Sequence, residues 1–272
     1  MGQWGDLRKR VLTAALLGPA ALLCVWLGAH WWAMLMAACV TGLAWEWVRL
    51  CGGSTRSLPG AVVPPIVLLA GGAAVMGWPV LGLLIVALGV FTAHYATQRA
   101  AGPVPPLWLA FGVLYIGLAG ISLIVLRQGD QVGRDNVIFL LLVVWASDIS
   151  AYVAGRSFGG PKLAVAVSPN KTWSGAVGGL LGALAVGVVA ASLLGPGASL
   201  GHMGLVAVVL GTATQSGDML ESWIKRRFGV KDSSGLIPGH GGLLDRLDGL
   251  LAAAPLAALI GAVAGPGVHL WR

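Results

Sequence analysis

The chain has 272 residues, of which 57% are hydrophobic and only 10% are charged, and its formal net charge at pH 7 is +7. A soluble globular domain carries roughly 25% charged residues, so the composition excludes a protein with an ordinary water-facing surface. The positive balance favours contact with anionic lipids or anionic nucleotides.

Long apolar segments follow one another along the chain. A helix that crosses the hydrocarbon core needs about 20 mostly apolar residues, and its backbone polar groups must be paired within the segment. The sequence therefore predicts an all-α fold, a polytopic membrane helical bundle with about nine transmembrane helices. The expected spans are residues 11–29, 31–50, 61–77, 79–97, 105–126, 136–154, 174–194, 202–220 and 249–265.

The distribution of Lys and Arg predicts the orientation of these spans, because cytoplasmic loops carry an excess of both residues. With the N-terminus in the cytoplasm, fourteen of the seventeen Lys and Arg residues lie inside. We therefore expect a multi-pass protein of the cell (inner) membrane, with the N-terminus and the active site on the cytoplasmic side. The Trp residues at positions 31, 32, 45, 47, 78 and 108 are interpreted as aromatic belts at the membrane surfaces.

Ionisable residues are distributed unevenly along the chain. The first five spans carry few, among them Glu46, whereas most of the polar chemistry lies in residues 155–173 and 221–248. We expect an N-terminal transmembrane scaffold half, residues 1–130, and a C-terminal transmembrane catalytic half, residues 131–272. Two interpretations of Glu46 stay open: it pairs with a site residue, or it lies near the membrane surface beside Arg49.

The first polar cluster begins inside the sixth span. An ionisable residue at the depth of Asp148 is a functional candidate by default, and Tyr152, four residues later, shares its helix face. The segment that follows ends in hydroxyls, an amide and an ammonium directly before an apolar helix, where phosphate binds well. Thr172 is equally explained as a helix N-cap. The candidates in this segment are Ser168, Asn170, Lys171 and Thr172.

The glycines of the seventh span form two overlapping small-xxx-small patterns. Gly175 and Gly179 form one, and Gly178 and Gly182 form the other. Such patterns let two membrane helices approach closely, so they predict tight helix packing rather than chemistry.

The second polar cluster spans residues 217–248. One face of a helix is shared by Asp218, Glu221, Ser222 and Lys225, and Asp218 ends an apolar run, where a carboxylate needs a partner or a metal. Asp245 and Asp248 lie three residues apart at the start of the last span. Two helix ends that carry carboxylates at one membrane surface can converge on a hard divalent cation, and oxygen ligands suit Mg²⁺.

A glycine-rich loop lies between these helix ends. His240 is flanked by Gly239, Gly241 and Gly242, so backbone N–H groups can approach an anion closely. A flexible hinge is the alternative. The neighbouring basic residues, which favour an anion site, are Lys225, Arg226, Lys231 and Arg246.

The stretch from Ser222 to Asp248, SWIKRRFGVKDSSGLIPGHGGLLDRLD, resembles the signature of the phosphatidate cytidylyltransferases, the CDP-diacylglycerol synthases. The segments DISAYVAGRSFGGPKL and SPNKTWSG are also similar to that family. Three positions depart from its pattern: Asn170 replaces a frequent Lys, Ser174 a usual Glu, and Ser233 a common aromatic residue.

The resemblance implies a helical multi-span fold that converts CTP and phosphatidate into CDP-diacylglycerol and pyrophosphate with Mg²⁺. It implies Asp218 and Asp245 as metal ligands, with Asp248 as a third, and it allows a monovalent cation such as K⁺. The expected partners are CTP, phosphatidate and bilayer lipids, but no nucleic acid; a homodimer is compatible with the family.

From these residues we hypothesise a direct attack of the lipid phosphate on the α-phosphorus of CTP, helped by positioning and charge neutralisation. The expected catalytic residues are Asp218, Asp245, Lys225 and Lys171. The expected substrate-binding residues are Asp148, Tyr152, Ser168, Asn170, Thr172, Ser222, Arg226, Lys231, His240, Gly241 and Arg246.

Two other functions also use intramembrane carboxylates. A cation-coupled transporter is one, although no internal repeat relates the two halves. A CTP-dependent lipid kinase is the other.

Overall fold

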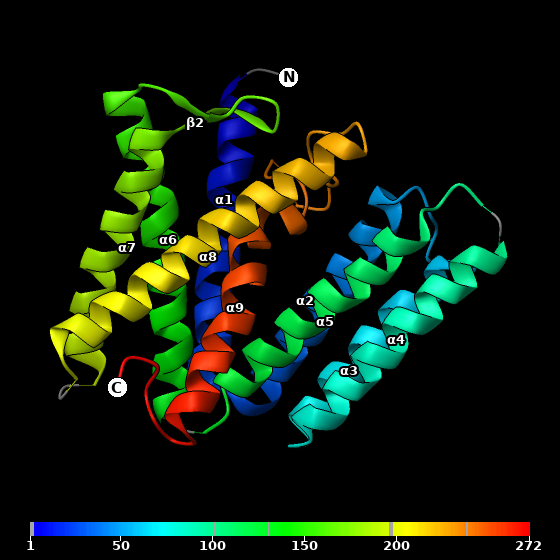
Figure 1. Cartoon of the computed structure of the whole chain (residues 1–272), viewed down its shortest axis with the longest axis horizontal. Coiled ribbons are helices and arrows are strands. Elements are labelled where there is room, and N and C mark those ends of the chain that lie inside the picture. The colour runs from blue at the N-terminus through cyan, green and yellow to red at the C-terminus, as the bar shows by residue number, and fades with distance from the viewer. Residues whose placement is uncertain (1–2, 101, 130, 196–197, 238) are drawn as a thin grey trace. The chain divides into compact units, whose positions relative to one another are not determined.

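The computed structural model describes residues 3–100, 102–129, 131–195, 198–237 and 239–272, with side chains from residue 15 onward. The described chain is almost entirely helical (Figure 1). The elements are α1 (Gln3–Leu27), α2 (Ala29–Leu50), η1 (Gly60–Val62), α3 (Val63–Val75), α4 (Pro79–Ala100), α5 (Pro106–Leu126), α6 (Gln131–Phe158), β1 (Lys162–Ala164), β2 (Ser168–Thr172), α7 (Trp173–Leu194), α8 (Leu200–Arg227) and α9 (Leu244–Ala264).

Six of the described helices are long and apolar enough to cross a membrane, namely α2, α4, α5, α6, α7 and α9. The apolar stretches of α1 and of η1 with α3 are shorter. On α4, Leu84, Leu88 and Phe91 repeat on one face and are more than 60% exposed, as expected of a surface that contacts lipid. The all-α, polytopic membrane prediction is confirmed, whereas the count of nine spans stays a prediction.

The chain divides into two compact units, and each is described by itself. Unit 1 comprises Met1–Val125 and Phe228–Leu247, and unit 2 comprises Leu126–Arg227 and Asp248–Arg272. The predicted division into a scaffold half and a catalytic half at residue 130, which is outside the described residues, stays a prediction.

Unit 1 is organised around Trp47 of α2. This indole is fully buried, donates from Nε1 to the carbonyl oxygen of Trp108 at 2.8 Å, and packs against Phe111 and Tyr115. Gly112 makes room for it, because a Cβ there would lie 2.1 Å from the indole ring. The aromatic-belt interpretation is therefore wrong for Trp47, which is a core residue held by a hydrogen bond.

Three further tryptophans of unit 1 differ in burial: Trp32 is buried, and Trp31 and Trp78 are exposed. Trp32 is 5% exposed and donates to the carbonyl oxygen of Leu123, so it too belongs to the core. Trp31 and Trp78 are more than half exposed, as an interfacial residue should be. Hydropathy could not separate Trp31 from Trp32, because the helix rotation that buries one of them is decided by packing.

Unit 2 is built on the close packing of α6 against α7, with α8 packed on both helices. A Cβ at Gly178 would lie 2.2 Å from Cβ of Ala154, and one at Gly182 would lie 2.0 Å from Oγ of Ser150. The predicted role of the small-residue patterns in helix packing is thus confirmed. Because these glycines have no side chain, α7 approaches α6 closely, and this close approach sets the geometry of the site between the two helices.

A short antiparallel hairpin, β1 and β2, joins α6 to α7 (Figure 1). Gly159 and Gly160 have positive φ values and end α6, and the Oγ1 of Thr172 accepts a hydrogen bond from the N–H of Gly175 at 3.1 Å. The N-cap interpretation of Thr172 is confirmed. The hairpin itself was not predicted, because a strand pair of three and five residues has no apolar alternation to reveal it.

Candidate active site

A cavity of about 590 Å³ in unit 2 collects much of the predicted chemistry. Asp148 and Tyr152 enter it from α6, Lys171 from β2, and Asp218 from α8. Residues from these three elements meet because α7, with its glycine face, brings the hairpin and α8 close to α6. The predicted site residues that line the cavity are Asp148, Tyr152, Asn170, Lys171, Thr172 and Asp218.

An ion pair crosses this cavity. The Nζ of Lys171 lies 2.7 Å from Oδ2 of Asp218, and the two side chains remain 27% and 33% exposed. The two side chains are only partly exposed, and the Nζ of Lys171 is buried. Both residues line the cavity, so a phosphate or a cation that enters it meets both charges.

Two more carboxylates of unit 2 belong to the same electrostatic environment. Asp148, Asp218 and Asp248 interact with one another through their charges, with Lys171 and Lys225 as the compensating cations. Lys225 also pairs with the buried Glu221 at 2.7 Å, one helical turn away. The result is a concentration of negative charge held in place by two lysines.

Within the part of the chain that the structure describes, no three His, Cys, Asp or Glu side chains are grouped closely enough to hold a metal ion by themselves. Mg²⁺ does not need such a cage, because it commonly takes one or two carboxylates and completes its shell with water and substrate phosphate. The donor type of Asp218 and Asp248 fits that requirement.

Several predicted residues of unit 2 lie outside the cavity lining. Ser168 pairs with Ala164 across the hairpin, and Ser222 is half-buried on α8. The Nε of Arg226 donates to the carbonyl oxygen of Val167 at 3.4 Å. Arg226 therefore joins the end of α8 to the hairpin.

The remaining predicted residues belong to unit 1, in the segment before α9 and its first turn. His240 is half-buried, and its carbonyl oxygen accepts a hydrogen bond from Nε of Arg246 at 3.0 Å. Gly241, at φ +85°, accepts from the N–H of Ile237 at 2.9 Å. Lys231 is exposed. The segment is thus a closed, hydrogen-bonded turn.

Asp245 holds that turn together. Its Oδ2 accepts from the N–H of Gly242 at 2.8 Å, from the N–H of Ser233 at 3.0 Å and from the Oγ of Ser233 at 3.1 Å. A carboxylate in the first turn of α9 is also well placed against the positive end of that helix. Asp218 belongs to unit 2 and Asp245 to unit 1, and their sharing of one ion stays a prediction.

Glu46 of α2 is the residue whose role the sequence left open. It is fully buried, and its carboxylate accepts from the N–H groups of Leu243 and Leu244 at 2.7 and 2.6 Å. The hydroxyls of Ser233 and Ser234 donate to the same carboxylate. Glu46 therefore pairs with the signature segment, whereas its depth relative to the membrane surface stays a prediction.

The position of Gly242 shows how tightly this anchor is packed. A Cβ there would lie 1.9 Å from Oγ of Ser233 and 2.8 Å from Oε1 of Glu46. A side chain at this position would therefore displace Ser233 or Glu46. Glycine fits the close packing around the buried carboxylate, and the hinge alternative stays a prediction.

Sequence reasoning did not select Gln215, Arg156 or the two serines. Gln215 and Arg156 line the cavity of unit 2, and the Nε2 of Gln215 donates to the carbonyl oxygen of Ala176 at 3.0 Å. Gln215 is uncharged and belongs to no recognisable motif, so the sequence does not indicate that it lines a cavity. Ser233 and Ser234 gave no signal either, because their partner Glu46 is nearly 190 positions away.

Comparison with known proteins adds an independent finding. Residues 8–264 match the model of a family described as the cytidylyltransferase family. A protein of Brucella abortus biovar 1 (strain 9-941) named phosphatidate cytidylyltransferase is 39% identical over 266 residues, which is 95% of this chain and 94% of that protein. A protein of Pseudomonas aeruginosa with the same name is 37% identical over 276 residues, 96% and 99% of the two chains. These matches confirm the resemblance carried by residues 222–248.

Proposed function

The chain belongs to the cytidylyltransferase family, which makes it a nucleotidyltransferase, and on this premise we propose that it converts CTP and phosphatidate into CDP-diacylglycerol and pyrophosphate. The relatives that match nearly the whole chain are named for phosphatidate. The observation that carries the proposal is the cavity of unit 2, which is lined by charged residues and contains the Lys171–Asp218 pair. Such a cavity in a chain of membrane-spanning helices suits a reaction between a water-soluble nucleotide and a lipid.

The proposed reaction is a direct displacement. A phosphate oxygen of phosphatidate forms a bond to the α-phosphorus of CTP, while the bond from that phosphorus to the oxygen bridging to the β-phosphorus breaks. The electron pair leaves with pyrophosphate. A phosphate monoester has a second pKa near 6, so the nucleophile is largely ionised at neutral pH and needs no general base.

The roles that we propose for the cavity residues follow from charge. Lys171 and Arg156 supply donors for phosphate oxygens, since charge-assisted hydrogen bonds of this kind are the strong ones. Lys225 and Arg226, at the end of α8, add positive charge on the path of pyrophosphate. Tyr152, Asn170 and Gln215 line the same space with neutral hydrogen-bonding groups that can orient the nucleotide.

Asp218 and Asp248 are the carboxylates that we propose for holding Mg²⁺, and Asp148 is close enough to add to their field. When bound, the ion would neutralise charge that develops on the phosphate oxygens. Asp245 is retained as a proposed ligand, although in unit 1 its oxygens accept three hydrogen bonds. Titration of Mg²⁺ into the Asp245→Asn protein separates a ligand role from a structural one, because only a ligand role raises the metal requirement in a stably folded variant.

The position of the label on CTP tests the reaction. Purified protein with phosphatidate, Mg²⁺ and CTP labelled at the α-phosphate should yield labelled lipid, whereas CTP labelled at the γ-phosphate should yield labelled pyrophosphate only. Lipid labelled from the γ-phosphate would identify a CTP-dependent lipid kinase instead. No labelled lipid from either nucleotide would refute the proposal, provided that the protein is folded and monodisperse.

We further propose that the active site faces the cytoplasm across the cell (inner) membrane. The support is the excess of Lys and Arg in the expected inner loops. A single cysteine at Lys231, which is exposed, in a chain whose three native cysteines are replaced by Ser, should react with a membrane-impermeant maleimide only after the cells are opened. Reaction in intact cells would reverse the orientation without affecting the proposed chemistry.

A further inference from the structure

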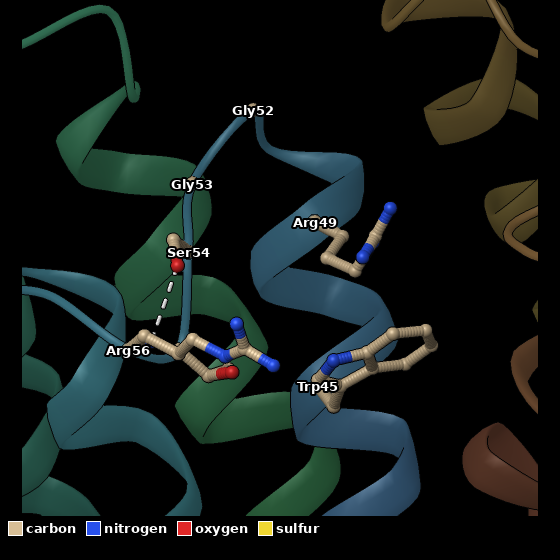
Figure 2. Close-up of a pocket in the computed structure, with 7 residues that line it drawn as sticks. Trp45, Arg49, Gly52, Gly53, Ser54 and Arg56 are labelled. Atoms are coloured by element: carbon tan, nitrogen blue, oxygen red, sulfur yellow. Dashed lines mark hydrogen bonds between the residues drawn. The ribbon is translucent and has the colours of Figure 1, made fainter.

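A second cavity, of about 530 Å³, lies in unit 1 where α2 ends and the following loop turns back (Figure 2). Trp45 and Arg49 come from the last turns of α2, and Ser54, Thr55 and Arg56 come from the loop. None of the residues that line this cavity has a role in the function proposed above. Its lining carries two guanidinium groups and no acidic residue.

The two arginines have no acidic partner within the described chain. No ion pair joins Arg49 or Arg56 to a carboxylate there. Between Asp6 and Asp130 the sequence contains a single acidic residue, Glu46. Its oxygens are buried and already accept hydrogen bonds from Leu243, Leu244 and two serines. The two guanidinium groups are exposed and can therefore take an anion from outside the chain.

Contacts within unit 1 orient Arg49 and close the loop that carries Arg56. The Cζ of Arg49 lies 4.8 Å from the centroid of the Trp45 ring, a cation–π contact that orients the guanidinium. The loop is closed by hydrogen bonds from the N–H of Gly53 to the carbonyl oxygen of Val48 and from the N–H of Arg56 to Oγ of Ser54. Figure 2 shows Arg56 and Ser54 on this loop, beside the helix that carries Trp45 and Arg49.

The location favours a lipid over a soluble anion. α2 is one of the helices able to cross a membrane, and Trp45 with Arg49 near its end has the character of an interfacial anchor. Anionic lipid headgroups concentrate at that depth, and the guanidinium fork matches two oxygens of a phosphate. We propose that this cavity, here named the α2-end pocket (Trp45, Arg49 and residues 52–56), binds the headgroup phosphate of an anionic phospholipid.

The test measures lipid retained by the full-length protein. Detergent-purified, delipidated protein is titrated with phosphatidylglycerol or phosphatidylcholine, and bound lipid is counted by native mass spectrometry. We expect retention of phosphatidylglycerol over phosphatidylcholine by the native protein. The Arg49→Gln/Arg56→Gln variant should lose about twentyfold in retention, the product of somewhat under fivefold for each of the two interfacial arginines.

Arg99→Gln is the matched control. Arg99 also belongs to unit 1 and stacks on an aromatic ring, that of Tyr95, with its Cζ 4.4 Å from the centroid, but it does not line the α2-end pocket. This variant removes one positive charge, as the single Arg56→Gln variant does, and should retain lipid like the native protein. Equal loss in the control would show that general surface charge is responsible, and would overturn the proposal.

Two other results would also overturn it. Native retention in the folded double variant would remove the arginines from lipid binding. Displacement of phosphatidylglycerol by millimolar inorganic phosphate would show that the pocket accepts any phosphate and is not a lipid headgroup site. Arg56→Gln alone provides a second measurement, since Arg56 lies on an exposed loop and its loss leaves α2 intact.

Discussion

The carboxylates of Asp218 in unit 2 and Glu46 in unit 1 occupy opposite environments. Asp218 lines a cavity, is a third exposed, and has a single close cation, Lys171. Glu46 is fully buried, and four donors from the segment before α9 surround it. A carboxylate that lines a cavity and accepts few hydrogen bonds from the protein can bind a ligand. A carboxylate whose oxygens already accept hydrogen bonds from the protein stabilises the fold instead. The following predictions test that contrast.

The largest effect is expected at Asp218. Asp218→Asn preserves the shape of the side chain but removes the charge that we propose for metal binding. We expect kcat/KM for CDP-lipid formation to fall about 1000-fold, equivalent to about 4 kcal/mol. The melting temperature in detergent should change little, because the amide oxygen of Asn can still accept a hydrogen bond from Lys171 and the pair is partly exposed. Asp232→Asn, at an exposed position, is the control, and native activity in Asp218→Asn would remove that carboxylate from the reaction.

Glu46→Gln should show the opposite pattern. The amide places an NH₂ group against backbone N–H donors of Leu243 and Leu244, so buried donors lose their acceptor. We expect a loss of about 3 kcal/mol in the free energy of unfolding, measured as a lower melting temperature and faster proteolysis within residues 228–243. Activity should fall with the loss of that segment's structure. Native stability would mean that the carboxylate is replaceable and that the contrast with Asp218 fails.

A glycine pair sharpens the description of the Glu46 anchor. Gly242→Ala inserts a Cβ against Ser233 and Glu46 and should destabilise the protein by about 2 kcal/mol, within the usual cost of overpacking. Gly235→Ala lies in the same segment, where nothing is within 4 Å of the added Cβ, and should be neutral. Equal melting temperatures for the two variants would show that the segment shifts freely, which a buried anchor does not allow.

The smallest effect is expected at Lys171. Lys171→Met removes one of the two cations that line the cavity and should raise KM for CTP about tenfold, the value of one charge-assisted contact of about 1.4 kcal/mol. Lys162→Met, an exposed position on the paired strand, is the matched control and should leave KM unchanged. A fall in kcat with an unaltered KM would assign Lys171 to the transition state rather than to nucleotide binding.

Local patterns were sufficient for one part of the site. Asp148 and Tyr152 were placed on one helix face by their spacing, Thr172 was recognised as a cap, and the glycines of α7 predicted the packing that brings Lys171 to Asp218. Each of these inferences uses residues within one helix turn or one connection. Spacing along a helix is a direct statement about geometry, which is why such predictions can be made without a structure.

By itself the sequence determined the membrane class, the helical fold, the family and the concentration of polar chemistry in residues 145–174 and 217–248. Hydropathy, helix periodicity and an unbroken signature are properties of neighbouring residues. Only the tertiary structure decided that Glu46 anchors the segment before α9, that Trp47 is core, and that two arginines with no acidic partner share a cavity with Trp45. Those facts depend on how helices rotate and which distant atoms they bring together, and packing of the whole unit is what decides both.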